Sequence, residues 1–212
     1  MKRFMFLVVV VCGFVVPDSW ATSPAAMENA LFTAAATGNL IQARMLLKQG
    51  AKVDVRDQHG DTPLHWAAGH GYPEMVKLLI SKGADVNARD GHGQTPLFGA
   101  DNAAVARLLI AHGALVNTRD VIGQTPLDRA AWAGRIPVIR VLLDHHALVN
   151  ARDINGFTPL DNAAWSGGNS LAVEALLRAH GAVFSRVPGS IPVAPVAPVP
   201  KIKMTRTTLG AQ

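Results

Sequence analysis

The chain contains a single cysteine, Cys12, among its 212 residues. One cysteine cannot form a disulfide within the chain, and it cannot build a cysteine-based metal site. Charged residues are also scarce, at 17%, and the formal net charge is +5, whereas apolar residues reach 49%. This composition is typical of a globular protein and lacks the clustered basic stripe of a nucleic-acid-binding domain. We therefore expect a folded chain that binds no nucleic acid.

Motifs of the common enzyme classes are missing as well. The sequence has no Gly-x-Ser-x-Gly elbow, no P-loop and no dinucleotide-binding glycine fingerprint. His59 and His92 occupy the same place in successive sequence units, which stacking would separate by roughly 10 Å. Metal ligands lie about 2 Å from their ion, so this pair cannot share one. We expect no enzymatic activity, no cofactor and no metal site; a pocket with convergent polar groups would be needed to revive the enzyme hypothesis.

The first 21 residues have the three-part layout of a secretory signal peptide. Lys2 and Arg3 form a positive region, residues 4–16 are an apolar run, and Ser19-Trp20-Ala21 offers small residues for cleavage. The run is shorter than the roughly 20 residues that cross a bilayer. An uncleaved anchor and a lipoprotein signal at Cys12 are the alternatives. We expect cleavage after Ala21, export to the periplasm or the extracellular space, and no membrane span in the mature form.

One sequence phrase, Asp-x-x-Gly-x-Thr-Pro-Leu, occurs four times, and each copy is followed by a Leu-Leu pair. A degenerate copy precedes them around Thr37-Gly38. Self-similarity at a period of about 33 residues predicts stacked helix-turn-helix units, of which the terminal ones are atypical. The four copies lie at residues 57–64, 90–97, 120–127 and 153–160.

This pattern resembles the ankyrin repeat, whose hallmark is Thr-Pro-Leu-His-x-Ala. Residues 62–67 match that hallmark at every position, and a threonine cap followed by proline is well suited to start a helix. The resemblance implies an all-α solenoid over residues 27–184, built from about five helix-turn-helix units with β-hairpin-like finger loops. A short linker at 22–26 would precede it. The expected units are 27–56, 57–89, 90–119, 120–152 and 153–184.

Some residues depart from the repeat pattern. The third unit is shorter than its neighbours and lacks the usual glycine turn between its helices, around Asp101-Asn102. His146 replaces the glycine of a left-handed helix end, and Asp128 and Asp161 replace the hallmark histidine. An Arg-Asp dipeptide opens each turn, as in Arg56-Asp57. We expect the stacked dipeptides to form an exposed ladder of charge pairs, each worth under about 1 kcal/mol.

The resemblance also indicates where a partner would bind, because ankyrin proteins contact their partners through finger tips and the inner helix face. The tips of the last two units are apolar, and a tryptophan stands at equivalent positions of both inner helices. Exposed apolar side chains with tryptophans are typical of binding hot spots. The alternative is that neighbouring units or the tail cover these residues. The predicted partner-binding residues are Val121, Ile122, Trp132, Ile154, Phe157 and Trp165, with His59, His92 and His70 from the polar half.

The tail at 185–212 is rich in proline and valine and carries no acidic residue. Its composition predicts a disordered segment that favours extended polyproline II structure. Lys201, Lys203 and Arg206 could contact an anionic surface, and the final residues lack an endoplasmic-reticulum retention signal, which favours a bacterial envelope. The leading hypothesis is a protein-binding module of the periplasm or extracellular space, acting as scaffold, inhibitor or assembly factor. The alternative is an envelope structural protein tethered through this tail.

Overall fold

The computed structural model describes residues 24–165 and 170–185. The predicted signal peptide and all of the predicted tail except Ser185 lie outside the described residues. Within them, ten α-helices form five antiparallel pairs and no strand is present, as the sequence predicted. The pairs are α1 (Pro24–Thr37) with α2 (Leu40–Lys48), α3 (Pro63–Gly69) with α4 (Pro73–Ser81), α5 (Pro96–Gly99) with α6 (Ala103–Ala111), α7 (Pro126–Trp132) with α8 (Ile136–Asp144), and α9 (Pro159–Trp165) with α10 (Ser170–Ala179).

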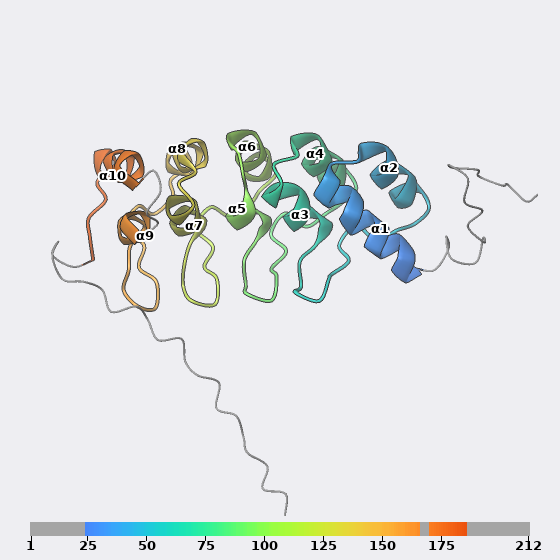
Figure 1. Ribbon diagram of the computed structural model, residues 1–212, viewed down its shortest axis with the longest axis horizontal. Helices are drawn as coiled ribbons and strands as arrows, with labels where there is room; N and C mark the ends of the chain where they lie inside the picture. The colour runs from blue at the N-terminus through green and yellow to red at the C-terminus, as the bar shows by residue number, and fades with distance from the viewer. Residues whose placement is uncertain (1–23, 166–169, 186–212) are drawn as a thin grey trace, which may run out of the picture.

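The pairs stack side by side into an elongated solenoid (Figure 1). The odd-numbered helices form an inner row and the even-numbered helices an outer row, and finger loops project from the inner row between successive units. Helix α1 begins at Pro24 rather than after the expected linker at 22–26. Proline is well suited to the first helical position, because its missing N–H has no partner there in any helix.

Threonine and proline start the inner helices, and left-handed residues follow the outer ones. Thr62, Thr95 and Thr125 have extended backbone angles at the N-cap, each followed by proline. After α8 the left-handed position is taken by His146, with φ of 63°. The expected replacement of glycine is therefore confirmed, and a side chain in this conformation costs about 1–2 kcal/mol.

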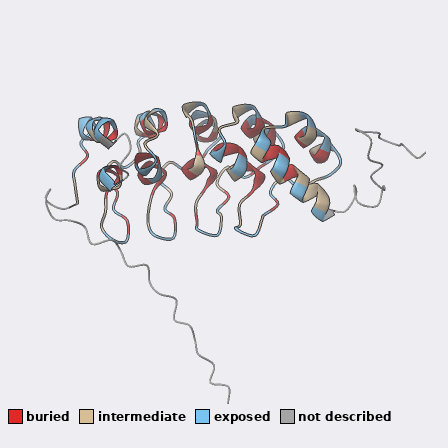
Figure 2. Ribbon diagram, in the orientation of Figure 1, coloured by how far each residue is buried: buried red, intermediate tan, exposed pale blue. Residues whose placement is uncertain are grey.

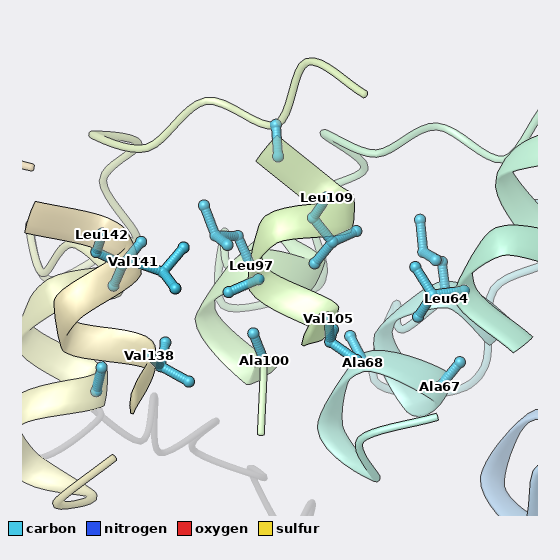
Figure 3. Close-up of a cluster of buried hydrophobic side chains, with 14 of the residues drawn as sticks. Leu64, Ala67, Ala68, Leu97, Ala100, Val105, Leu109, Val138, Val141 and Leu142 are labelled. Carbon is cyan, nitrogen blue, oxygen red and sulfur yellow. The ribbon is translucent and has the colours of Figure 1, made fainter. Parts of the chain in front are cut away.

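A single hydrophobic core runs between the two rows. Leucines that follow the Thr-Pro pairs, such as Leu97, are fully buried from the inner row, and Leu109 and Leu142 are fully buried from the outer row. Figure 3 shows these side chains filling the space between neighbouring units. Buried positions line the facing surfaces of the helices, while the outer surfaces are exposed (Figure 2). No unit could bury its apolar stripe alone, so the stack is the folding unit.

Neighbouring units complete the shortened third unit. Helix α5 has four residues, and the segment after it bonds backwards to the second unit: the Asp101 N–H donates to the Ala68 carbonyl (3.2 Å). The Asn102 amide donates to the Gly71 carbonyl (3.0 Å). From the fourth unit, Arg135 donates to the Gly99 carbonyl (3.3 Å) and lies 3.6 Å from the Asp101 carboxylate. The missing turn is thus replaced by contacts between units.

Candidate partner-binding surface

Each finger loop is closed by its own aspartate. In the first finger, the Asp57 carboxylate accepts from the His59 N–H (2.8 Å) and the Asp61 N–H (3.0 Å). The Asp57 N–H donates to the Asp61 carbonyl across the base of the turn (3.0 Å). The same pattern recurs at Asp90, Asp120 and Asp153. These carboxylates are therefore committed to holding the loops in shape.

Backbone hydrogen bonds join the tips into a row. The Gly91 N–H donates to the His59 carbonyl (2.8 Å), and the Val121 N–H donates to the His92 carbonyl (2.9 Å). The Ile154 N–H continues the series to the Ile122 carbonyl. The four fingers consequently form one connected surface.

The expected ladder of Arg-Asp charge pairs is wrong. Arg119 donates to the Gly123 carbonyl of its own finger (2.8 Å) and to the Arg152 carbonyl of the next (2.6 Å), and Arg56 makes the equivalent bonds. Among the described residues, no ion pair joins these arginines to the turn aspartates. The aspartates already accept two backbone N–H groups each, so the guanidinium groups bind carbonyls instead.

An aromatic groove lies between the fourth and fifth units; it is defined here by Ile122, Arg129, Trp132, Phe157 and Trp165. It encloses about 240 Å³. The Phe157 and Trp165 rings lie 6.2 Å apart at 46°, and the Arg129 guanidinium lies over the Trp132 ring at 4.8 Å. Trp132 and Trp165 remain 50% and 47% exposed. Large apolar surfaces thus face solvent on both walls.

The structure brings four of the predicted residues into this groove: Ile122, Trp132, Phe157 and Trp165. Val121 and Ile154 lie beside it at the finger tips, 64% and 71% exposed. Arg129 was missed by the sequence analysis. It stands three residues before Trp132 on α7, a spacing that places two side chains on one helix face and could have revealed the contact.

The polar half of the predicted site lies outside the aromatic groove. His59 and His92 are exposed at the first two finger tips, and His70 lies between the rings of Trp66 (5.8 Å) and Tyr72 (6.2 Å). Trp66 was also missed by the sequence analysis. Its indole N–H donates to the Asp57 carboxylate at 3.0 Å, so part of this tryptophan holds the first finger loop.

One cluster has the residue types of a metal site. Potential ligand atoms of Asp61, His65 and Asp90 all lie within 4.8 Å of one another. However, the Thr62 N–H donates to His65 Nδ1 (3.1 Å), and His65 Nε2 faces the Gln94 carbonyl (3.2 Å). Nε2 must therefore carry the proton, and Nδ1 is already engaged. The imidazole has no free lone pair for a metal ion.

The two aspartates that replace the hallmark histidine are helix caps. Asp128 accepts from the Thr125 N–H (2.8 Å) and hydroxyl (2.7 Å), and Asn162 donates to its second oxygen (2.9 Å). Burial raises the pKa of Asp128, although these hydrogen bonds act in the opposite direction. Asp161 caps α9 in the same way through Thr158. Both carboxylates are thus occupied by structural hydrogen bonds.

Comparisons with known proteins agree with this architecture. Family models described as ankyrin repeats match residues 16–90 and 109–161, together more than half of the chain. The chain belongs to the ankyrin-repeat family. Proteins of this family are typically non-enzymatic modules that bind other proteins. Among the described residues of this ankyrin-repeat protein, no helix is long and apolar enough to cross a membrane.

Similar proteins share the repeats over short stretches. The chain is 41% identical over 49 residues to a putative ankyrin repeat protein of Rickettsia felis, covering 23% of this chain and 78% of that protein. It is 46% identical over 46 residues to protein phosphatase 1 regulatory subunit 27 of Homo sapiens, covering 22% and 30%. For the Apicidin F cluster transcription factor of Gibberella fujikuroi the identity is 43% over 49 residues, covering 23% and 13%. The chain spans less than a third of the last two proteins.

Proposed function

We propose that this ankyrin-repeat protein acts as a scaffold, inhibitor or assembly factor whose protein partner binds the aromatic groove and the adjoining finger tips. The observation that carries the proposal is the half-exposure of Trp132 and Trp165 on neighbouring inner helices, where the preceding leucines are fully buried. Aromatic side chains are common anchors of binding energy, and exposed apolar clusters mark interaction surfaces. Val121 and Ile154 would extend the contact along the tips.

The rigidity of the surface supports the same role. Backbone bonds between tips and the arginine contacts hold the fingers of the fourth and fifth units in one arrangement. A preorganised surface loses little conformational entropy when a partner binds, so more of the contact energy appears as affinity. The relative named as a regulatory subunit of protein phosphatase 1 accords with a role exerted through binding.

The test compares aromatic truncations with a matched polar one. After a partner is captured by the wild-type chain and identified by mass spectrometry, calorimetry measures its affinity for Trp132→Ala, Trp165→Ala, Phe157→Ala and Gln58→Ala. We expect each aromatic change to weaken binding by about 30-fold or more, equivalent to about 2 kcal/mol, while Gln58→Ala changes little. Circular dichroism checks that folding survives. Unchanged affinity in all three aromatic variants would move the site to the polar tips around His59 and His92.

We further propose that the protein is exported and acts in the periplasm or outside the cell. The signal-like layout of residues 1–21 supports this, and cleavage would leave Thr22 as the first residue. N-terminal sequencing of the protein from an envelope fraction should give Thr22; a chain that begins at Met1 would contradict the proposal. Release of the wild-type protein only by high salt would favour the alternative, a tether through the basic tail.

A further inference from the structure

The described chain ends at the edge of the aromatic groove. The Ser185 N–H donates to the Asp161 carboxylate (3.1 and 3.3 Å to its two oxygens), and the Thr158 hydroxyl donates to the Val183 carbonyl (3.0 Å). Asp161 also lines the cavity of the groove, beside Trp165 and Phe157. Residues 186–212 therefore continue from a point fixed on the fifth unit.

The sequence that follows has a regular spacing. Pro192, Pro195 and Pro198 recur every third residue. A polyproline II helix has three residues per turn, so these prolines would share one edge, about 9 Å apart. The segment contains no acidic residue and carries Lys201 and Lys203 shortly afterwards. Its composition therefore favours an extended polyproline II conformation with a proline edge, followed by two basic residues.

The groove has the chemistry that recognises such a segment. Aromatic-lined grooves bind polyproline II segments by packing proline rings against aromatic faces. Trp132 and Trp165 stand at equivalent ends of α7 and α9, which are neighbouring helices of the inner row. Packed helices lie roughly 10 Å apart, close to the spacing of successive edge prolines.

The length of the segment after Ser185 and the charge of the tail both favour the chain's own tail as the occupant of the groove. Six residues, 186–191, separate Ser185 from Pro192 and can extend to about 20 Å. That length exceeds the roughly 10 Å needed to cross one unit. Asp153 and Asp161 are lining residues of the groove together with one basic residue, Arg129, and the resulting negative charge complements the basic residues of the tail.

We propose that residues 192–198 bind in the aromatic groove of the same chain, with proline rings against Trp132 and Trp165. This inference rests on the proposed function in one respect, since the groove is also the proposed partner surface. A partner must then displace the tail, and its apparent affinity falls by the fraction of molecules whose groove is open. The tail would thereby set the threshold for partner binding.

The test observes the tryptophan indole N–H signals of the full chain by ¹⁵N NMR, assigned through single Trp→Phe variants. In the variant P192A/P195A/P198A, we expect the Trp132 and Trp165 signals to shift relative to wild type. The Trp66 signal should stay in place, because Trp66 lies at the other end of the solenoid, bonded to Asp57; it therefore also reports that the fold is intact. The control T207A/T208A changes the tail outside the proline segment and should leave all signals unchanged.

A second arm identifies the occupant. A synthetic peptide of residues 186–212, added to the triple proline variant, should return the Trp132 and Trp165 signals toward their wild-type positions in a saturable manner. Identical signals in wild type and the triple variant would overturn the proposal. Signal positions that depend on protein concentration would also overturn it, because a second copy would then supply the tail. No partner is present, so the result does not depend on whether the proposed function holds.

Discussion

At the scale of single residues, the hallmark histidine and its aspartate replacements solve the same hydrogen-bonding problem. His65 offers Nδ1 to the Thr62 N–H, and Asp128 offers one carboxylate oxygen to the Thr125 N–H and hydroxyl. A carboxylate has a second oxygen, and in Asp128 it accepts from Asn162 of the next unit. The replacement therefore keeps the cap and adds a bond between units, at the cost of a buried titratable group.

Burial of this group makes stability depend on pH. Desolvation raises the pKa of Asp128 above its usual 3.8, so the folded state holds the proton more tightly than the unfolded chain. The free energy of unfolding should then fall as pH rises above about 4, by at most about 1.4 kcal/mol per pH unit for one group. Asp128→Asn should flatten this decline in urea denaturation measured from pH 4 to 7.

Two other aspartates are needed to interpret that measurement, one as a second titrating group and one as a control. Burial also raises the pKa of Asp61, so part of the pH dependence should survive in Asp128→Asn. Asp144 is exposed at the end of α8, and Asp144→Asn serves as the control for the removal of one negative charge. If Asp128→Asn and wild type lose stability with pH at the same rate, Asp128 is not the titrating group.

At the scale of elements, the third unit shows how a repeat can lose its turn and remain in the stack. Asn102 takes over two tasks: its side-chain oxygen caps α6 by accepting from the Val105 N–H (3.0 Å), and its amide donates to the Gly71 carbonyl. Asn39 caps α2 by accepting from the Gln42 N–H (3.1 Å), but within the described residues it makes no hydrogen bond to another unit. The two asparagines thus form a natural pair for comparison.

We expect Asn102→Ala to cost more stability than Asn39→Ala. Loss of an N-cap costs about 1 kcal/mol in either case. The additional bond to Gly71 should add about 1 kcal/mol to the cost of Asn102→Ala, because a carbonyl loses its partner. Midpoints of urea denaturation give both values. Equal losses would show that the bond between units contributes nothing to stability.

At the scale of the whole molecule, stability comes from contacts between neighbouring units. Leu142 is fully buried in the continuous core, whereas Leu148, in the following finger, is 55% exposed. Leu142→Ala should cost about 2–5 kcal/mol, because it leaves a cavity between units. Leu148→Ala should cost far less. Denaturation followed by circular dichroism tests this, and similar midpoints for the two variants would contradict the assignment of the core.

The finger tips also change from polar to apolar along the solenoid. The first two finger tips carry His59 and His92, while the last two carry Val121 and Ile154 beside the aromatic groove. Both halves share one backbone frame, since the same tip-to-tip hydrogen bonds connect all four fingers. The fold supplies the frame, and the variable tip residues decide where an apolar partner could bind.

The sequence by itself determined the all-α repeat fold, the Thr-Pro starts of the inner helices and the left-handed His146, because caps and turns depend on residues a few positions apart. It also named the four apolar residues that line the groove. Only the tertiary structure decided that arginines bind the carbonyls of the next finger and that Ser185 is held by Asp161. Most of these contacts join residues far apart in the chain, and each depends on distances and on competition for partners that sequence spacing does not specify.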